Sequence, residues 1–229
     1  MTLPSSVPAD QSLRVALETS VRAASVAIAV EGRIQTKSLE PGRAHASDLL
    51  PCLNELLADR PPKPDWIAVG LGPGSYTGLR VGIATALGLA EGSGAQLVGV
   101  PSVEALAWRL LAPGEIGAVV LDARGGEFYL ACYERSSNDT TEVLAPTALR
   151  PAELSSHLPG EARVFTEPAL VDHPALAGVE PDRILAGEIP DAASVLQLGA
   201  LRHAAHGPQD PAQVRPLYLR PFGVKPRKR

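Results

Sequence analysis

The chain has 229 residues, a formal net charge of -4 and 45% hydrophobic residues, so it is long enough to bury a core without disulfides. Its two cysteines give no disulfide framework, and the charge balance gives no basic field for nucleic acid. Residues 1–12 lack the basic start and apolar centre of a signal peptide, and no apolar run reaches membrane length. We therefore expect a cytoplasmic protein that does not contact a membrane.

The first half of the chain predicts three strands, a helix, a strand, a helix, a strand and a helix. Apolar runs bounded by turn residues predict the strands, over 13–20, 24–31, 34–39, 66–71 and 96–100. The first helix covers 47–58 and has a broad leucine face, with Pro51 expected near its first turn. Further helices follow Gly74 and begin near Ser102.

The second half repeats the start of the first. A strand over 118–123, a turn over 124–126 and an alternating strand over 127–134 follow one another. Aligning Leu17-Glu18-Thr19 with Leu121-Asp122-Ala123 suggests a duplicated unit. Residues 159–190 are rich in Pro, Ala and Gly, and their structure cannot be predicted from this pattern.

The stretch over 69–90, VGLGPGSYTGLRVGIATALGLA, predicts a strand, a sharp turn and a buried helix. Gly78, Gly82, Ala86 and Ala90 recur every fourth residue, so they line one face that another backbone can approach closely. Each glycine inside a helix costs about 0.5–1 kcal/mol relative to alanine, so a compensating contact is needed. That contact lies either inside the lobe or with a partner. Because the helix is apolar nearly all round, both of its faces need cover.

The glycines before this helix do not match the known phosphate-binding motifs. A dinucleotide fingerprint would need glycine at Ser75 or Thr77, and a P-loop would need a lysine before a serine or threonine. A nucleophile elbow would need glycine at Pro73 and Thr77. What remains is a helix N-terminus with free backbone donors, which does not identify a ligand.

Several motifs together resemble the TsaB (YeaZ) family of bacterial proteins, which are needed to make threonylcarbamoyladenosine in tRNA. They are LETS, HASDLLPCLNELL, GPGSYTGLRVGIATALGLA, GVPSVEALA, LDARGGEFYLACYE and PLYLR, which run in order from about residue 13 to residue 220. The resemblance implies an α/β fold of two ribonuclease H-like lobes of the actin-like ATPase (ASKHA) superfamily, with mixed sheets flanked by helices. We place a flexible tail at 1–12, a partner-binding lobe at 13–112, a more divergent lobe at 113–220 and a basic tail at 221–229.

The resemblance also implies a non-catalytic subunit that binds and supports a TsaD-like catalytic subunit. A TsaE-like ATPase would act on the complex, tRNA would be contacted only indirectly, and the chain would form a homodimer when its partner is absent. We expect no cofactor, no metal and no catalytic residue in this chain. The predicted interface comprises Leu49, Leu53, Leu56, Gly78, Leu79, Gly82, Ile83, Ala86 and Ala90.

Enzymatic alternatives remain open at this stage: a self-sufficient small-molecule kinase or a metallopeptidase of the same superfamily. In TsaD a helix beginning H-x-x-x-H supplies metal ligands, but here His45 is followed four residues later by Leu49, and one histidine cannot build a metal site. Glu18 and Asp122 occupy the acidic positions of an ATPase, and the late glycine pair that would cradle adenosine is missing. These two carboxylates are either remnants at strand ends or part of a weak nucleotide site.

The basic tail over 225–229, KPRKR, has two readings: it touches tRNA phosphates or it stays solvated. No aromatic residues alternate with its cations, so the sequence does not predict a base-stacking surface.

Overall fold

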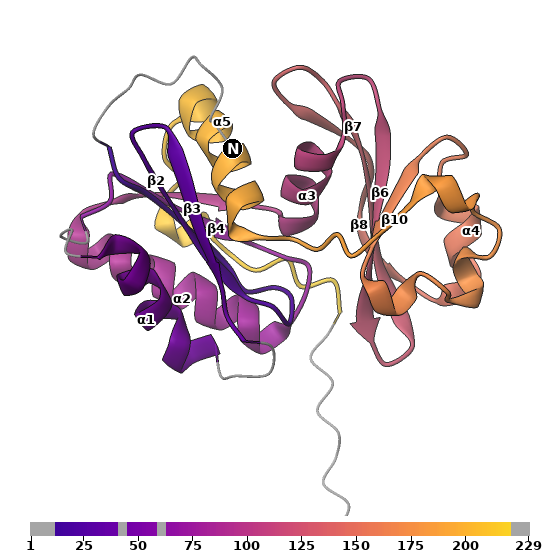
Figure 1. Ribbon diagram of the computed structural model, residues 1–229, viewed down its shortest axis with the longest axis horizontal. Helices are drawn as coiled ribbons and strands as arrows, with labels where there is room; N and C mark the ends of the chain where they lie inside the picture. The colour runs from indigo at the N-terminus through magenta and orange to yellow at the C-terminus, as the bar shows by residue number, and fades with distance from the viewer. Residues whose placement is uncertain (1–11, 41–44, 59–62, 221–229) are drawn as a thin grey trace, which may run out of the picture.

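The computed structural model describes residues 12–40, 45–58 and 63–220, which form two lobes side by side (Figure 1). The first lobe contains a mixed five-stranded sheet in the order β3-β2-β1-β4-β5. The strands β1, β2 and β3 form an antiparallel meander, and β4 and β5 continue the sheet parallel to β1. The bounds are Arg14–Glu18 for β1, Ser25–Val30 for β2, Arg33–Ser38 for β3, Trp66–Gly70 for β4 and Gln96–Val100 for β5.

Helices cover both faces of this first sheet. On one face lie α1 (His45–Leu57) and α2 (Tyr76–Ser93), whose buried side chains form one core with the strands. On the other face lies α5 (Ala192–His206), which packs on a second core that includes Ala16 and Ala68. The predicted place of Pro51 was wrong, because α1 begins at His45 and Pro51 lies inside the helix rather than in its first turn.

The second lobe contains a five-stranded sheet in the order β10-β9-β6-β7-β8. Here β6, β7 and β8 form the antiparallel meander, while β9 and β10 run parallel to β6. The bounds are Ile116–Arg124 for β6, Glu127–Arg135 for β7, Thr140–Leu149 for β8, Arg163–Thr166 for β9 and Ile184–Ala186 for β10. This is the order of the first sheet, so the duplication and the two ribonuclease H-like lobes are confirmed, with β1 equivalent to β6.

Residues 151–183, which overlap the stretch 159–190 that the sequence left unpredicted, contain short helical elements. They are α4 (Leu154–His157) and four 3-10 turns, each of which begins at a proline: Pro151–Glu153, Pro168–Leu170, Pro174–Leu176 and Pro181–Arg183. Proline suits the first position of a turn because its missing N–H would have no partner there. Leu170 and Leu176 anchor these turns in the core beneath the second sheet.

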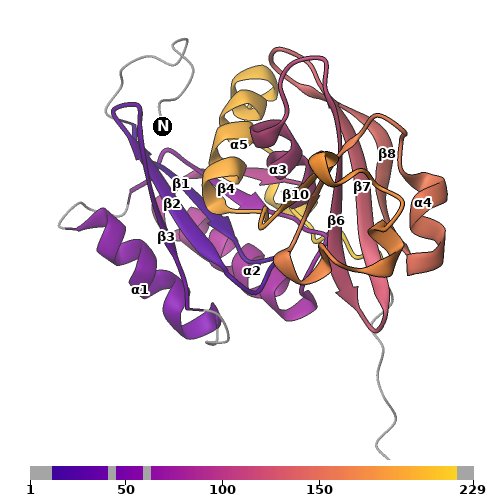
Figure 2. The ribbon, with the colours of Figure 1, turned by 45° about the vertical axis from the view of Figure 1, so that its right-hand side comes forward.

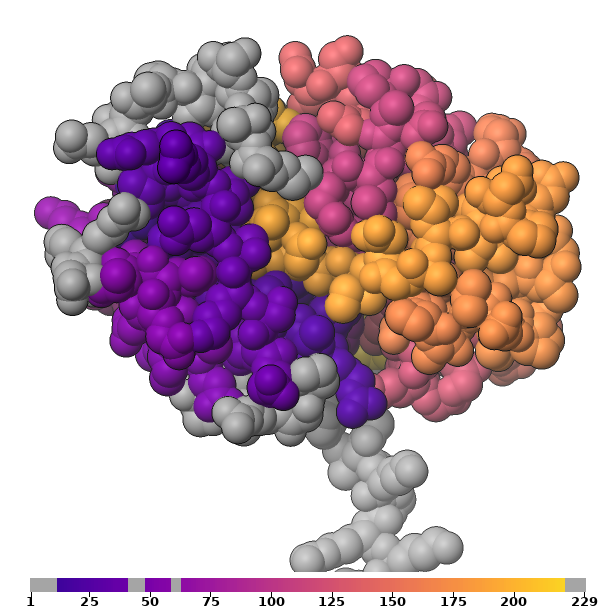
Figure 3. Space-filling model, viewed as in Figure 1, coloured from indigo at the N-terminus to yellow at the C-terminus, as the bar shows by residue number. Residues whose placement is uncertain are grey.

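The last helix of each repeat lies between the two sheets. The helix α3 (Ser102–Leu110) buries Val103 and Leu106 against the second sheet, although it follows the strands of the first. The helix α5 follows the strands of the second repeat and packs on the first sheet, beside α3 (Figures 2 and 3). Each of these helices therefore completes the core of the other lobe's sheet, and the division of the chain at residues 112 and 113 stays a prediction.

The segment after α5 ties the two lobes together. The amide of Gln209 donates to the Leu97 carbonyl at 2.8 Å, and the amide of Leu217 donates to the Leu71 carbonyl at 2.8 Å. Arg220 then reaches the second lobe, where its Nη1 donates to the Ala123 carbonyl at 2.7 Å. Residues 1–11 of the predicted tail 1–12, and the whole of the predicted tail 221–229, lie outside the described residues.

Candidate functional site

The turn before α2 approaches the end of β1 closely. Ser75 caps the helix, its Oγ accepting from the Gly78 amide at 3.2 Å, and its own amide donates to the Ser20 carbonyl at 2.7 Å. A Cβ added at Gly74 would lie 2.2 Å from that same carbonyl oxygen. The turn therefore needs glycine because the backbone after β1 occupies the space of a side chain.

The small-residue face of α2 packs against Thr19. A Cβ added at Gly78 would lie 2.1 Å from the Thr19 carbonyl oxygen, and one at Gly82 would lie 2.1 Å from Thr19 Oγ1. The chain itself thus supplies the close contact that both glycines require. Of the two explanations that the sequence left open, internal packing accounts for this face.

The predicted interface residues lie mostly beneath the surface of the isolated chain. Eight of the nine are buried inside the lobe: Leu49, Leu53, Gly78, Leu79, Gly82, Ile83, Ala86 and Ala90. The ninth, Leu56, is half-buried. Their part in a partner interface stays a prediction. A helix that is apolar on all sides has two small faces, and the spacing of the residues does not tell which one turns inward.

The opposite face of α2 is exposed and also carries small and apolar residues. Ala84 and Gly88 are exposed on it, and Val81 and Leu87 beside them are half-buried. Apart from its chain neighbours and the adjoining backbone of α2, no described atom lies within 4 Å of a Cβ added at Gly88. On the neighbouring helix α1, the side chain of Leu50 is 42% exposed. These five residues are called the outer α1–α2 face below.

Glu18, at the end of β1, is fully buried. Its Oε1 accepts from the Ser20 amide at 2.6 Å, and its Oε2 has no hydrogen-bond partner among the described residues. Burial raises the pKa of the Glu18 carboxyl above its usual range, and hydrogen bonds from Ser102 and Ser20 offset part of that rise. A Cβ added at Gly70 would lie 2.1 Å from Oε2, so the carboxyl is enclosed by its own lobe.

Asp122, at the equivalent end of β6, has a different environment. It is exposed, its Oδ1 accepts from the Arg124 amide at 2.7 Å, and its own amide donates to Glu167 Oε1 at 2.9 Å. Among the described residues, no hydrogen bond or ion pair joins Asp122 to Glu18. One carboxyl is enclosed and the other lies in an exposed turn, so the two have different environments, and their part in a weak nucleotide site stays a prediction.

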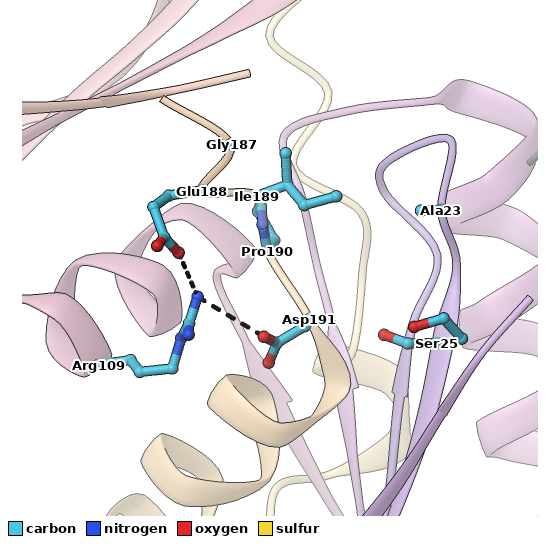
Figure 4. A pocket seen from close by; sticks show the side chains of 9 residues that line it. Ala23, Ser25, Arg109, Gly187, Glu188, Ile189, Pro190 and Asp191 are labelled. Carbon is cyan, nitrogen blue, oxygen red and sulfur yellow. Dashed lines mark hydrogen bonds and ion pairs between the residues drawn. The ribbon is translucent and has the colours of Figure 1, made fainter. Parts of the chain in front are cut away.

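A cavity of about 290 Å³ lies beside the first hairpin, where the chain crosses from β10 to α5 (Figure 4). Arg109, at the end of α3, points across it and binds Glu188 Oε2 at 2.9 Å and Asp191 Oδ2 at 3.6 Å. Asp191 also caps α5, its Oδ1 accepting from the Ser194 amide at 2.7 Å. The guanidinium of this cavity is already paired with two carboxylates, which makes the cavity a poor receptor for a phosphate.

Within residues 12–40, 45–58 and 63–220, no three His, Cys, Asp or Glu side chains come together as metal ligands would. The same described part of the chain contains no helix long and apolar enough to cross a bilayer. His45 begins α1, and the surroundings of its side chain lie outside what the structure describes.

A surface cluster that the sequence did not predict lies at the start of α2. The rings of Tyr76 and Tyr218 stack with their centroids 4.8 Å apart, and the Arg80 guanidinium lies 4.1 Å above the Tyr76 ring. Arg80 Nε donates to the Tyr218 hydroxyl at 3.0 Å, across a separation of 138 positions in the chain. No local sequence pattern signals a contact between residues so far apart. These three residues are called the Tyr–Arg–Tyr cluster below.

Two ribonuclease H-like lobes with helices exchanged between their sheets define a member of the actin-like ATPase superfamily. The family model described as "TsaD: tRNA N6-adenosine threonylcarbamoyltransferase" matches residues 39–175. The Escherichia coli "tRNA threonylcarbamoyladenosine biosynthesis protein TsaB" is 33% identical over 159 residues, which cover 64% of this chain and 68% of that protein. The chain belongs to the TsaB (YeaZ) family.

Two further relatives support this assignment. The TsaB of Haemophilus influenzae is 34% identical over 122 residues, which span 51% of this chain and about half, 52%, of that protein. A crystal structure described as an uncharacterized protein with similarity to peptidase YEAZ from Pseudomonas aeruginosa superposes with a TM-score of 0.78. It is 30% identical, and the superposition covers 91% of this chain and 100% of that one.

Proposed function

We propose that this chain is a non-catalytic subunit required for threonylcarbamoyladenosine modification of tRNA, and that it binds a TsaD-like catalytic subunit. The curated relatives are named for that biosynthesis, and the matching family model is that of the transferase itself. The catalytic step belongs to the partner, and this chain supports it by complex formation.

The outer α1–α2 face carries this proposal. Gly88 and Gly92 lie on the exposed side of α2, and each costs about 0.5–1 kcal/mol relative to alanine. Neither has a described neighbour within 4 Å of an added Cβ, so the lobe itself gives no reason for glycine. A partner backbone packed closely on this face supplies the reason, and the exposed Leu50 adds apolar area to the contact.

The buried residues that the sequence first suggested act beneath this surface. Gly78 and Gly82 let α2 sit directly on Thr19, and Leu49 and Leu53 fix α1 to the same core. This inner layer holds the two helices as a rigid platform, on which the outer residues meet the partner.

The charged side chains of Glu18 and Arg109 also support a non-catalytic role. Glu18 is enclosed and its pKa is raised, so it is poorly suited to hold a metal–phosphate group. Arg109 is neutralised by Glu188 and Asp191 before any ligand arrives. The same outer α1–α2 face takes a second copy of this chain when the TsaD-like subunit is absent, and a TsaE-like ATPase acts on the assembled complex.

Co-purification and reconstitution test the proposal. This chain and the TsaD-like subunit of the same cell are expressed together, with an affinity tag on one of them. We expect a stoichiometric complex, and we expect tRNA modification to require both proteins. ATP turnover or peptide hydrolysis by this chain alone, at a rate that the second subunit does not change, would support the kinase or metallopeptidase alternative instead.

A further inference from the structure

We propose that a second copy of this chain docks on the outer α1–α2 face with its α2 helix antiparallel, so that Arg80 of each copy pairs with Glu91 of the other copy. The inference rests on the proposed function in one respect, since that function makes this face an interface between chains. It goes further by fixing the direction of the second helix and by naming the two residues that select it.

The outer side of α2 has the residue spacing of a helix-pairing seam. Five residues on it are separated alternately by three and four positions, and all are exposed except Leu87, which is half-buried: Thr77, Arg80, Ala84, Leu87 and Glu91. This alternation is the one along which two helices pack in a coiled coil. Because Ala84 in the middle of the seam is small, the backbone of a second helix can approach closely there.

The seam carries opposite charges at its two ends. Arg80 and Glu91 are about three helical turns apart, so they point in nearly the same direction and lie about 16 Å from each other along the axis. The residues between them, VGIATALGLA, carry no charge. A two-fold axis brings residue i of one copy against residue j of the other and the reverse. Turning the second copy end for end therefore makes two attractive pairs, whereas a parallel copy would place like charges opposite each other.

Neither charge is neutralised within its own chain. Arg80 Nε donates to the Tyr218 hydroxyl and the guanidinium lies over Tyr76, so the Tyr–Arg–Tyr cluster holds this cation in place with its terminal nitrogens left for an anion. Among the described residues, neither Arg80 nor Glu91 takes part in an ion pair. Glu91 also lies in the last turn of α2, where the helix dipole disfavours an anion and no basic residue offsets it. Arg80 of a second copy supplies that cation.

Apolar side chains beside the seam have a different part in the contact. Leu50 of α1 is 42% exposed, and Val81 and Leu87 are half-buried, so a second copy covers apolar surface on both helices. This burial stabilises the pair whichever way the second helix runs. Arg80 and Glu91 select the direction, because opposite charges steer the encounter and like charges placed face to face are repulsive.

Sedimentation equilibrium of the full-length chain without its TsaD-like partner tests the proposal. Arg80→Glu and Glu91→Arg are each expected to raise the dimer Kd by about tenfold, because each change makes both attractive pairs repulsive. The double variant carrying both changes, and an equimolar mixture of the two single variants, should return close to the wild-type Kd. Glu161→Arg, at an exposed acid of the second lobe, is the control and leaves the Kd unchanged. Added salt should weaken the wild-type dimer and strengthen those of the single variants.

The outcomes separate this inference from the proposed function. A wild-type chain that stays monomeric, single variants that dimerise as well as the control, or a double variant as weak as the single ones overturns the antiparallel pair. Recovery in the mixture supports it and shows that both single variants are folded. Wild-type binding to the TsaD-like subunit is measured separately. Its failure beside the expected charge pattern contradicts the proposed function in the TsaD-like partner alone, and its success without that pattern contradicts this inference alone.

Discussion

Thr19 Oγ1 lies where the side chain of residue 82 would have to be, 2.1 Å from a Cβ added at Gly82. Gly82→Ala is therefore expected to lower the free energy of unfolding by about 1–3 kcal/mol through overpacking, despite the better helix propensity of alanine. Thr19→Ala removes the atom in conflict and should restore part of the stability. Urea unfolding of the single and double variants measures this, and an unchanged midpoint for Gly82→Ala would contradict the packing described.

Gly78 provides the matched comparison. Its added Cβ would lie 2.1 Å from the carbonyl oxygen of Thr19, a backbone atom that no side-chain substitution removes. Gly78→Ala should be as destabilising as Gly82→Ala, and Thr19→Ala should not rescue it. Equal rescue of both variants would show that the two glycines do not make separate contacts.

Gly88→Ala is expected to have opposite effects on folding and on association. The isolated chain should gain about 0.5–1 kcal/mol of stability, since alanine favours the helix and the added Cβ has open space. If a partner backbone packs on this position, the same methyl group should weaken dimerisation. Thermal unfolding under monomeric conditions and sedimentation analysis measure the two effects. A variant with stronger self-association would contradict the close approach.

The buried carboxyl of Glu18 should make stability depend on pH. Burial raises its pKa in the folded protein, so the folded state holds a proton that the unfolded chain releases as pH rises above about 4.5. Its contribution to stability is complete below the unfolded pKa and is lost as pH rises through the higher folded pKa. Glu18→Gln should be more stable than the wild type at pH 7 and close to it near pH 4.5. Parallel stability curves for the two proteins would refute this.

The ion pair of Arg109 and Glu188 joins α3 to the segment that enters α5. Their side chains are 21% and 32% exposed, so solvent screens the interaction and the coupling should be small, about 0.2–1 kcal/mol. A double-mutant cycle with Arg109→Gln and Glu188→Gln measures it, and 1 M salt should reduce it. A coupling energy that 1 M salt leaves unchanged would contradict the partial exposure of these two side chains.

The sequence predicted local structure better than it predicted which faces pack together. Alternation and turn residues located β1, β2 and β3, and the echo of Leu17-Glu18-Thr19 revealed the duplication. The strand β8 was missed, and it carries Pro146 in a polar edge strand. The exchange of α3 and α5 between the sheets, like the stack of Tyr76 on Tyr218, joins distant parts of the chain and leaves no local signature.

The proposed interface depends on one distinction, between the inner and outer faces of α2. Gly82 faces Thr19 and Gly88 faces open space, so substitutions at the two positions report on different events. A large charged residue at Gly82 would disrupt the fold and could not test pairing. The same substitution at Gly88 leaves the core intact and places its side chain in the proposed contact.

The affinity of this chain for the TsaD-like subunit is therefore the most direct test of the account. It should be measured for the wild type, for Gly88→Arg and for Gly160→Arg, a control at an exposed glycine of the second lobe that also has open space. We expect Gly88→Arg to raise Kd by at least about tenfold, with an unchanged unfolding midpoint, and Gly160→Arg to behave as the wild type. Equal Kd values for all three proteins would contradict the assignment of the outer α1–α2 face as the partner-binding surface.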